Sequence, residues 1–459
     1  MTVFGTQFGI DTRDPGEYLA ALEVIKFEKL KKQIAYVFTN EDYYKRRFLE
    51  AGVTSPEDIR SLDDFRRLPA FLDKQRHRES QERSLERYGH PFGLHLTAPL
   101  DKVVHIAATS GTTGQPTFYA FTKRDLATNH RIMARVFHLI GLRPGDTTLH
   151  AFGLSLWLAG FTIAQALEEY GARPVAVGAE SGIPKILRYI QYTRPRALFA
   201  TPSLVSQLIE RAPEEIGKPV GDLGIEILFC TGEPGVGLAA FRQRVTEAYG
   251  ARVFDMTGGA WHNATVSCGS EDYHGMHYLA EDYCFRYDLI DPVSKKPIAI
   301  RDGAIGEAIH TGLEYEAAPA FRNATGDILK LEVGECPGCS RFGVRMHIVG
   351  RADDMLNVKG VKVYPSAFQD VVQLFQSRAS GQLRIRLDAP PPRVEPPLKL
   401  VVEAGAGLPE AEWGALGEDI ARRCREILAI RPKVTVVPFG ALPRSNQKTK
   451  LIEVGGAVA

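Results

Sequence analysis

Residues 107–117, which are rich in hydroxyl side chains and glycines, have the composition of a phosphate-binding loop. They follow an apolar run from Val103 to Ala108, interrupted only by His105, that predicts a buried strand. Glycines let a backbone approach a ligand, and successive N–H groups and hydroxyls form a nest for phosphate oxygens. The spacing differs from a Walker A loop, which carries a Lys before its Ser or Thr. Taken alone, this segment is also compatible with an ordinary polar turn.

The exact residues of this segment carry a family resemblance. The string Thr-Ser-Gly-Thr-Thr-Gly-Gln-Pro-Thr resembles the phosphate loop of the adenylate-forming superfamily, which includes acyl-CoA synthetases and luciferases. The usual pattern has Lys where this chain has Gln115, so a charge is lost while the backbone nest is kept. The resemblance implies that the ATP phosphates are bound by Thr109, Ser110, Gly111, Thr112, Thr113 and Gly114.

A second signature occupies residues 350–365, Gly-Arg-Ala-Asp-Asp-Met-Leu-Asn-Val-Lys-Gly-Val-Lys-Val-Tyr-Pro. It resembles the hinge segment of the superfamily, and its Asp-Asp-Met and Val-Tyr-Pro fit the phenylacetate-CoA ligase branch. The opening segment, residues 43–69, resembles the same branch. The resemblance implies nucleotide-binding roles for Arg351 and Lys359 and a hinge at Asp353-Asp354.

The candidate catalytic residue is Lys448, close to the C-terminus. It follows Pro443-Arg444-Ser445, and the string resembles the closing motif of the superfamily, in which the Lys contacts the carboxylate and the α-phosphate. Attack of a carboxylate on ATP brings two anions together, and a cation aimed at the transferring phosphorus relieves that charge. Without this context, a lone Lys in a polar tail is usually solvated.

Apolar strand-like and helical segments alternate through the middle of the chain. Strands are predicted over 146–151, 172–177, 197–200, 225–230 and 252–255, and helices over 123–140, 158–170, 184–192, 204–211 and 239–249. This alternation predicts a doubly wound α/β domain with a mainly parallel sheet. The first ninety residues predict helices, over 17–36 and from a start at Thr54-Ser55-Pro56-Glu57. Residues 278–309 predict a small antiparallel β unit.

Loops that follow parallel strands are the expected ligand-binding segments. Three such stretches are Thr201-Pro202-Ser203, residues 230–235 and residues 255–260, each of which could alone be a surface turn. The resemblance implies that Gly232-Glu233-Pro234 and Asp255-Met256-Thr257 flank the adenine. It also implies that Asp327, in a Thr-Gly-Asp context, accepts hydrogen bonds from the ribose hydroxyls, which a carboxylate can do.

The third stretch departs from the family pattern. The superfamily usually has Tyr-Gly-Leu-Ser/Thr-Glu there, and that Glu helps to hold magnesium, whereas this chain has Met256-Thr257-Gly258-Gly259-Ala260 with Trp261 and His262. Magnesium is an expected cofactor, but its usual ligand is missing. The candidate acid pocket consists of Phe152, Trp157 and Trp261, although core packing would explain the first two equally well.

The cysteines predict a structural zinc site. Cys336-Pro337-Gly338-Cys339 is a Cys-x-x-Cys knuckle suited to two ligands of one metal ion, and Cys268, His274 and His277 precede it. Members of the resembled branch hold zinc with a similar set, and Gly275-Met276-His277 matches their His best. The chosen ligands are Cys268, His277, Cys336 and Cys339. A redox role for the Cys-x-x-Cys would need a thioredoxin-like setting at a helix start, which the sequence does not show. A zinc deaminase would need His-x-Glu and Pro-Cys-x-x-Cys motifs, and neither is present.

Three parts are expected along the chain: a helical segment over 1–90, an adenylate-forming core over 91–350 and a mobile C-terminal domain over 351–459. In the last part, strands are predicted over 361–363, 382–387, 398–404 and 432–438, with helices over 366–376 and 410–429. The order β-α-β-β-α-β is typical of a ferredoxin-like α+β domain.

Composition and charge limit the classes of protein to which the chain could belong. The chain has 459 residues, 44% of them hydrophobic and 24% charged, with a formal net charge of +1. The charge gives no electrostatic argument for binding nucleic acid or a membrane surface. The longest apolar run, residues 149–166, is interrupted by two glycines and a Gln, so core burial is favoured over a membrane span. Residues 1–16 have no basic region followed by an apolar core, so no signal peptide is predicted. In the absence of a secretion signal, the six cysteines are expected to be reduced or metal-bound, and a cytoplasmic location is expected.

The resemblance implies an ATP-dependent acid–CoA ligase of the phenylacetate-CoA ligase type. Its expected partners are an aromatic or hydrophobic carboxylic acid, ATP and coenzyme A, and its expected cofactors are magnesium and structural zinc. Two alternatives stay open: an adenylating ligase that passes the acyl group to a carrier protein or an amine, and a non-catalytic homologue that binds nucleotide or acyl groups. The sequence does not fix the acid or the oligomeric state, and a homodimer is left open.

Overall fold

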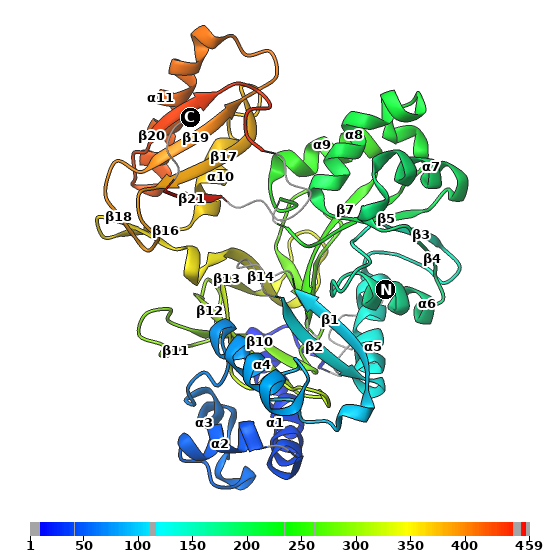
Figure 1. Ribbon diagram of the computed structural model, residues 1–459, viewed down its shortest axis with the longest axis vertical. Helices are drawn as coiled ribbons and strands as arrows, with labels where there is room; N and C mark the ends of the chain where they lie inside the picture. The colour runs from blue at the N-terminus through cyan, green and yellow to red at the C-terminus, as the bar shows by residue number, and fades with distance from the viewer. Residues whose placement is uncertain are drawn as a thin grey trace. The chain divides into compact units, whose positions relative to one another are not determined.

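The computed structural model describes residues 10–40, 42–109, 116–233, 235–259, 263–443 and 451–455. Its contacts divide the chain into two compact units. The larger unit comprises Met1–Thr325 and Lys330–His347, and the smaller unit comprises Gly326–Leu329 and Ile348–Ala459. Figure 1 labels most of the elements of both units.

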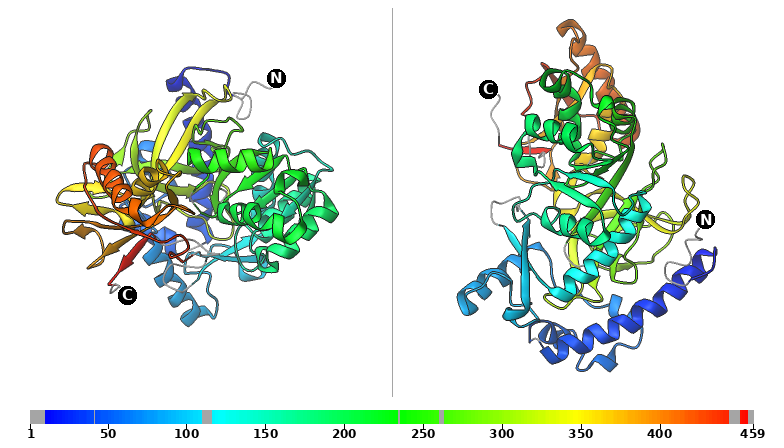
Figure 2. Two further views of the ribbon diagram at one scale, coloured as in Figure 1. Left: turned by 90° about the horizontal axis from the view of Figure 1, so that it is seen from above. Right: turned by 90° about the vertical axis from the view of Figure 1, so that its right-hand side faces the viewer.

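Helices dominate the start of the larger unit, as predicted. They are α1 (Pro15–Asn40), α2 (Asp42–Glu50), α3 (Leu62–Arg66) and α4 (Lys74–Tyr88), and α1 is the long blue helix of Figure 2. The predicted helix start at Ser55-Pro56 is present but gives only a single 3-10 turn, Pro56–Asp58. Among the described residues, none of the helices combines the length and the apolarity that a bilayer crossing requires.

The middle of the larger unit is a doubly wound α/β layer. Parallel strands in the order β4-β3-β5-β6-β7 alternate along the chain with helices. The strands are β3 (Thr147–His150), β4 (Arg173–Ala176), β5 (Ala197–Ala200), β6 (Ile227–Cys230) and β7 (Arg252–Gly259). The helices are α5 (Lys123–Leu139), α6 (Phe161–Tyr170), α7 (Ile183–Thr193), α8 (Pro202–Ile216) and α9 (Ala239–Tyr249). The predicted α/β fold class is confirmed.

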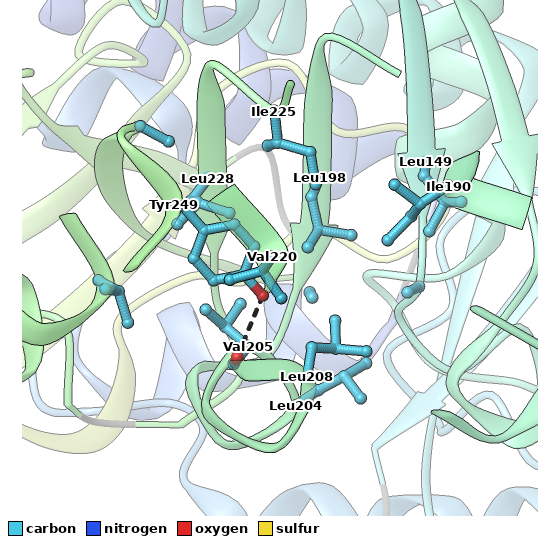
Figure 3. Packing of buried hydrophobic residues seen from close by; sticks show 14 of the residues in the cluster. Leu149, Ile190, Leu198, Leu204, Val205, Leu208, Val220, Ile225, Leu228 and Tyr249 are labelled. Carbon is cyan, nitrogen blue, oxygen red and sulfur yellow. Dashed lines mark hydrogen bonds between the residues drawn. The ribbon is translucent and has the colours of Figure 1, made fainter. Parts of the chain in front are cut away.

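Helices cover both faces of these strands. On one face, Leu198 and Leu228 pack against Leu208 of α8 and Tyr249 of α9, whose hydroxyl donates to the carbonyl of Val205 at 3.2 Å (Figure 3). On the other face, Phe199 of β5 lies edge to face with Phe137 of α5, with ring centroids 6.1 Å apart. Burial on both faces explains why these strands are continuous apolar runs rather than alternating ones.

The antiparallel strands predicted within residues 278–309 are present, and they continue the same sheet. The strands are β8 (Asn263–Ser267), β9 (Met276–Tyr278), β10 (Cys284–Ile290), β11 (Pro297–Ile298), β12 (Ile305–Gly312), β13 (Asn323–Glu335) and β14 (Phe342–Arg351). Within the described residues, twelve strands have the order β11-β10-β12-β13-β14-β9-β8-β7-β6-β5-β3-β4. The sheet is therefore mixed, and the predicted parallel pairing holds for β3 to β7 only. A separate two-stranded sheet consists of β1 (Val103–Thr109) and β2 (Thr117–Thr122).

The smaller unit contains helices α10 (Pro365–Gln373) and α11 (Trp413–Leu428) and two sheets. One sheet has the order β16-β15-β18, formed by β15 (Leu356–Val358), β16 (Val361–Val363) and β18 (Arg393–Val394). The other has the order β20-β19-β17-β21, formed by β17 (Ala379–Leu387), β19 (Lys399–Ala404), β20 (Lys433–Val437) and β21 (Ile452–Val454).

This strand order corrects the ferredoxin-like prediction, although the unit does contain α-helices and β-strands. The strand predicted over 361–363 lies outside the four-stranded sheet and pairs with Leu356–Val358 instead. The physical reason is local: Lys359 and Gly360 both have positive φ, 48° and 90°, as a two-residue hairpin turn requires. The edge of the four-stranded sheet is taken by β21, which pairs in parallel with β17.

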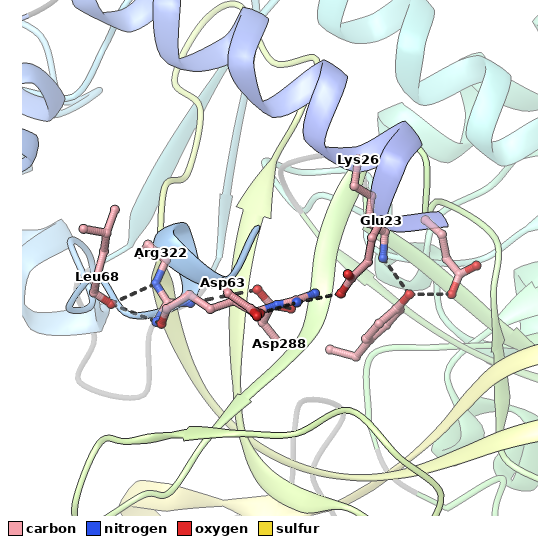
Figure 4. A network of polar contacts seen from close by, with 9 residues as sticks. Glu23, Lys26, Asp63, Leu68, Asp288 and Arg322 are labelled. Atoms are coloured by element: carbon pink, nitrogen blue, oxygen red, sulfur yellow. Dashed lines mark hydrogen bonds and ion pairs between the residues drawn. The ribbon is translucent and has the colours of Figure 1, made fainter. Parts of the chain in front are cut away.

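Buried and partly buried charges fasten the first helices to β10 of the large sheet (Figure 4). Arg66 of α3 contacts Glu23 of α1 and Asp288 of β10 at N–O distances of 2.6 and 3.3 Å. Lys26 of α1 is buried and donates to the hydroxyl of Tyr287 at 2.6 Å. Because removing one partner of a buried pair leaves an uncompensated charge, these contacts fix how α1 and α3 lie on β10.

Two histidines are buried side by side near the start of the larger unit. His77 of α4 lies edge to face with His95, with ring centroids 4.6 Å apart. Burial lowers the pKa of His77 to about 4 and lowers the pKa of His95 well below its ordinary value. Both imidazoles are therefore neutral in the native protein at pH 7.

We expect the free energy of unfolding to decrease as the pH falls from about 6.5 toward 4. In this window the unfolded chain binds a proton at position 77 that the native protein does not bind, so acid favours unfolding. At pH 5, His77 alone should account for about 2 kcal/mol. Urea unfolding at pH 7 and pH 5 measures this difference.

In His77→Phe, the free energy of unfolding should differ less between pH 7 and pH 5 than in the wild-type protein. This holds whatever the stability of the variant at pH 7. The matched control is His138→Asn, which removes an exposed histidine of α5 and should keep the wild-type difference. An unchanged difference in His77→Phe would contradict the assignment.

Candidate active site and metal centre

Three of the sequence-predicted stretches meet at one edge of the large sheet. The last residues of β5 and β6, Ala200 and Cys230, are direct partners in the parallel ladder, and Cys230 is in turn paired with Asp255 of β7. The segments beginning at Thr201, Thr231 and Asp255 therefore lie side by side at the carboxyl ends of the strands. Ligands of open α/β sheets bind at this kind of edge.

The stretch after β6 is held against the start of α8. Glu233 Oε1 accepts a hydrogen bond from the backbone N–H of Ser203 at 2.6 Å, and Thr201 caps the helix through its hydroxyl. Gly232 has φ of 97° and faces the methyl group of Thr201. The resemblance implied that Glu233 contacts the nucleotide. In the structure its carboxylate stabilises the N-terminus of α8.

Asp255, Met256 and Thr257 lie within β7 and not in a loop after it, which corrects the predicted strand end at residue 255. The reason is the hairpin with β8, in which Met256 faces Val266 and Thr257 faces Thr265. Met256 is buried, so its side chain belongs to the core, while Asp255 and Thr257 are partly exposed.

Asp255 has partners that the sequence did not reveal. The hydroxyl of Tyr273 donates to its Oδ2 at 2.7 Å, and its own backbone N–H donates to Ser267 Oγ at 2.9 Å. Burial raises the pKa of Asp255 to about 6, an effect opposed by the hydrogen bond from Tyr273 and by Arg242. Tyr273 and Arg242 follow no motif in the sequence, so nothing there indicates their role.

The predicted phosphate segment begins beside the predicted acid pocket. The segment after β3 pairs with β1 at Ala108. The N–H of Ala108 donates to the carbonyl of Leu156 at 2.5 Å, and Ala108 forms an isolated parallel β-bridge with Trp157. Thr109, the last residue of β1, is half-buried. Trp157 is 37% exposed, whereas Phe152 is buried and packs edge to face with His150. Trp157 is thus available to a ligand, whereas Phe152 belongs to the core.

Several predicted site residues lie outside the described residues. They are Ser110, Gly111, Thr112, Thr113, Gly114, Pro234, Trp261 and the candidate catalytic Lys448. Their roles stay predictions.

In the smaller unit, two predicted nucleotide-binding residues are in contact. Arg351, the last residue of β14, donates to Asp327 Oδ1 at 2.9 Å and contacts Asp353 Oδ1 at the same distance. Asp353 and Asp354, the predicted hinge, form a 3-10 turn with Ala352. Lys359 is exposed in the turn between β15 and β16. Asp327 is thus held by a guanidinium whose geometry suits a carboxylate.

The four chosen metal ligands come together from distant parts of the chain. Cys268 follows β8, His277 lies in β9, and Cys336 and Cys339 form the tip of the β13–β14 hairpin. Their ligand atoms all lie within 4.8 Å of one another, and Cys339 Sγ is 3.4 Å from His277 Nε2. His274, the alternative ligand, is not part of this group. Three thiols and one imidazole around one point form a donor set that fits tetrahedral zinc.

The surroundings of this cluster suit a metal bound by thiolates. Burial lowers the pKa of His277, which favours the neutral imidazole that a metal requires. A hydrogen bond from Cys339 lowers the pKa of the Cys268 thiol. Arg341 lies close enough to interact electrostatically with the three cysteines, and one guanidinium would balance the net charge of a zinc ion with three thiolates.

Comparison with known proteins identifies the class. The structure superposes on 2-hydroxyisobutyryl-CoA ligase in a postadenylation state with a TM-score of 0.83 and 25% identity, covering 98% of this chain and 92% of that one. A benzoate CoA ligase from Burkholderia xenovorans LB400 shares the fold, with a TM-score of 0.52, 17% identity and coverage of 76% and 67%. The fold is that of adenylate-forming CoA ligases. No protein-family model matches the chain.

Curated relatives narrow the class further. Phenylacetate-coenzyme A ligase of Thermus thermophilus is 32% identical over 451 residues, which cover 94% of this chain and 95% of that protein. The Escherichia coli K12 protein of the same name is 28% identical, with 93% of each chain covered. This chain therefore belongs to the phenylacetate-CoA ligase family, and the predicted resemblance is confirmed.

Proposed function

We propose that this chain activates an aromatic or hydrophobic carboxylic acid with ATP as an acyl-adenylate and transfers the acyl group to coenzyme A, releasing AMP and pyrophosphate. The observation that carries the proposal is the 32% identity to a phenylacetate-CoA ligase over 94% of the chain. The meeting of the predicted nucleotide stretches at one sheet edge supports it. So do the structures of 2-hydroxyisobutyryl-CoA ligase, which contain an acyl-AMP alone or with coenzyme A.

The family motifs suggest which residues would bind the nucleotide. Gly232-Glu233-Pro234 and Asp255-Met256-Thr257 would flank the adenine, and the segment Thr109 to Gly114 would bind the phosphates. Asp327 would accept the ribose hydroxyls while Arg351 keeps its carboxylate oriented, as their 2.9 Å contact supports. Lys359 would add a positive charge near the phosphates.

The chemistry has two steps. An oxygen of the substrate carboxylate attacks the α-phosphorus of ATP, the bond to the bridging oxygen of the β-phosphate breaks, and pyrophosphate leaves. Lys448 stabilises the negative charge that gathers on the α-phosphate. The sulfur of coenzyme A then attacks the acyl carbon, its proton passes to solvent, and AMP leaves.

The second step would follow a rotation of residues 351–459 about Asp353-Asp354. These two residues end a short 3-10 turn between β14 and β15, and hinges are usually a few residues at the ends of elements. The related 2-hydroxyisobutyryl-CoA ligase is described in postadenylation, open and thioesterification states, which supports the same alternation here.

The acid would bind near Trp157, and Trp261 and Phe152 are the other residues proposed for this pocket. Magnesium would accompany ATP, but residues 256–270 contain no carboxylate that could replace the usual Glu. The protein would therefore leave most of the magnesium coordination to the triphosphate and water. Magnesium binds proteins in this way in many phosphate-transfer sites.

The metal cluster would hold a structural zinc ion through Cys268, His277, Cys336 and Cys339. Four protein ligands leave no open coordination position, so the zinc would stabilise the fold locally and take no part in the reaction. None of the six cysteines, all of which the structure describes, is in a disulfide, and a cytoplasmic location, where thiols stay reduced, belongs to the same proposal.

The purified protein should contain about one zinc ion per chain, measured by inductively coupled plasma mass spectrometry. Cys336→Ser should lose the zinc and lower the unfolding temperature, since a thiolate ligand is removed. The matched control is Cys424→Ala, a buried cysteine of α11, which should keep its zinc. Zinc retained at full stoichiometry in Cys336→Ser would contradict the ligand set.

Carboxylate-dependent ATP–pyrophosphate exchange over a panel of aromatic and aliphatic acids tests the proposed function. Exchange with an aromatic or hydrophobic acid is expected, followed by thioester formation when coenzyme A is added. Thioester formation with a carrier protein, or amide formation, in place of coenzyme A would show a different acceptor. ATP binding without exchange over the whole panel would favour a non-catalytic homologue.

Lys448→Ala should slow adenylation by about two to three orders of magnitude, because a charge aimed at the transferring phosphorus is lost. It should affect thioester formation from supplied acyl-adenylate much less. The control is Lys433→Ala, an exposed lysine that begins β20. Equal losses in both half-reactions would contradict the role of Lys448.

A further inference from the structure

The segment between two of the metal ligands, residues 268–277, reaches the nucleotide edge of the sheet. Its half-buried Tyr273 donates a hydrogen bond to Asp255 Oδ2 at 2.7 Å. Asp255 is the first of the three residues of β7 that the proposed function places beside the adenine. Through this contact, the metal-binding segment touches one wall of the nucleotide site.

The ring of Tyr273 also touches the other wall. A Cβ atom placed on Gly237 would lie 3.1 Å from Tyr273 Cε1 and 3.4 Å from Cδ1, so the ring packs directly on the backbone there. Gly237 belongs to the stretch that runs from the Gly-Glu-Pro turn into α9. A side chain at position 237 would collide with the ring of Tyr273. This contact explains why the residue is a glycine, since its φ is not positive and its backbone conformation does not require one.

Arg242 of α9 fastens the same segment to β7. Its guanidinium donates to the carbonyls of Ser270, of Glu271 at 3.2 Å and of Val253 in β7 at 3.3 Å. It also lies over the ring of Tyr273, 5.7 Å from the centroid. Arg242 is buried, so these bonds are shielded from water.

The remaining side of Tyr273 faces the strand that carries the rest of the metal knuckle. Its ring lies edge to face with His347 of β14, with centroids 5.7 Å apart. The strands β13 and β14 lead to Cys336 and Cys339 at the hairpin tip. Tyr273 is therefore enclosed by α9, β7, β14 and the Gly237 backbone, and it has little freedom to move once both ends of its segment are fixed.

We propose that Tyr273 is a positioning residue of the nucleotide site, which sets the separation of the Gly-Glu-Pro stretch from β7 and is held in place by the metal at Cys268 and His277. The inference rests on the proposed function, which assigns these two stretches to the adenine. A metal bound at both ends of a ten-residue segment limits the conformations that the segment can adopt, and so it prepares the site before ATP arrives.

The test is equilibrium binding of a non-hydrolysable ATP analogue, measured by calorimetry without acid or coenzyme A. Tyr273→Phe removes only the hydroxyl that reaches Asp255, and it should raise the dissociation constant roughly tenfold while the zinc content stays at the wild-type value. In steady-state assays, the KM for ATP should rise more than kcat falls. The matched control is Tyr249→Phe, which removes the hydroxyl of a buried tyrosine of α9 bonded to Val205 and should leave analogue binding unchanged.

A double-mutant cycle tests the contact with Gly237. Gly237→Ala should weaken analogue binding in the wild-type background, because the new methyl group displaces the tyrosine ring. It should have little further effect in Tyr273→Ala, where the obstructing ring is absent, so the two effects should not add. Additive effects would overturn the proposed contact.

Removal of zinc by a chelator should weaken analogue binding while the far-ultraviolet circular dichroism is retained. Unchanged affinity after zinc removal, or loss of the whole dichroism signal, would overturn the part assigned to the metal. Unchanged affinity in Tyr273→Phe would overturn the positioning role alone. Failure of the wild-type protein to bind the analogue would overturn the proposed function as well, so the two failures are distinguishable.

Discussion

The pairing of β7 is the constraint on which the larger unit depends. Residues 252–255 pair in parallel with β6, and residues 256–259 pair antiparallel with β8. One strand therefore joins a doubly wound layer, whose edge carries the proposed nucleotide stretches, to an antiparallel layer, whose turns carry the candidate metal ligands. Asp255 lies where the pairing changes, and its hydrogen bonds to Tyr273 and Ser267 come from the antiparallel side. A shift of β7 by one residue would exchange its buried and exposed faces and separate both sites.

The candidate metal cluster also depends on the order of the strands in the sheet. Its ligands come from the end of β8, from β9 and from the β13–β14 hairpin, three places that the sheet order brings together. Cross-linking them through the proposed ion would give the proposed nucleotide edge a rigid support. Arg242 and Tyr273 connect that support to β7.

Much of the fold followed from local pattern. Helix α9 and strand β5 occupy the residues expected for them, because apolar spacing and flanking glycines or prolines define both ends. The four metal ligands were chosen from residue type and family resemblance, and the structure brings them together. The errors arose where a strand pairs with a neighbour in the chain through a hairpin that the sequence pattern did not indicate. The β15–β16 hairpin competes with the ferredoxin-like sheet, and the turn at Lys359-Gly360 favours the nearer partner. The hairpin of β7 with β8 likewise lengthened a strand expected to end at Asp255.

The sequence by itself determined the family, the α/β class and the candidate chemistry, because these depend on residue types at short spacings: the phosphate segment, the hinge signature and the Cys-x-x-Cys knuckle. Only the tertiary structure decided that the antiparallel strands continue the parallel sheet, that Glu233 caps α8, and that Tyr273 and Arg242 connect the metal segment to β7. These contacts join residues far apart in the chain, such as Glu233 with Ser203 or Asp255 with Tyr273. Long-range pairing is selected by the whole packed core, and no local pattern in one sequence records it.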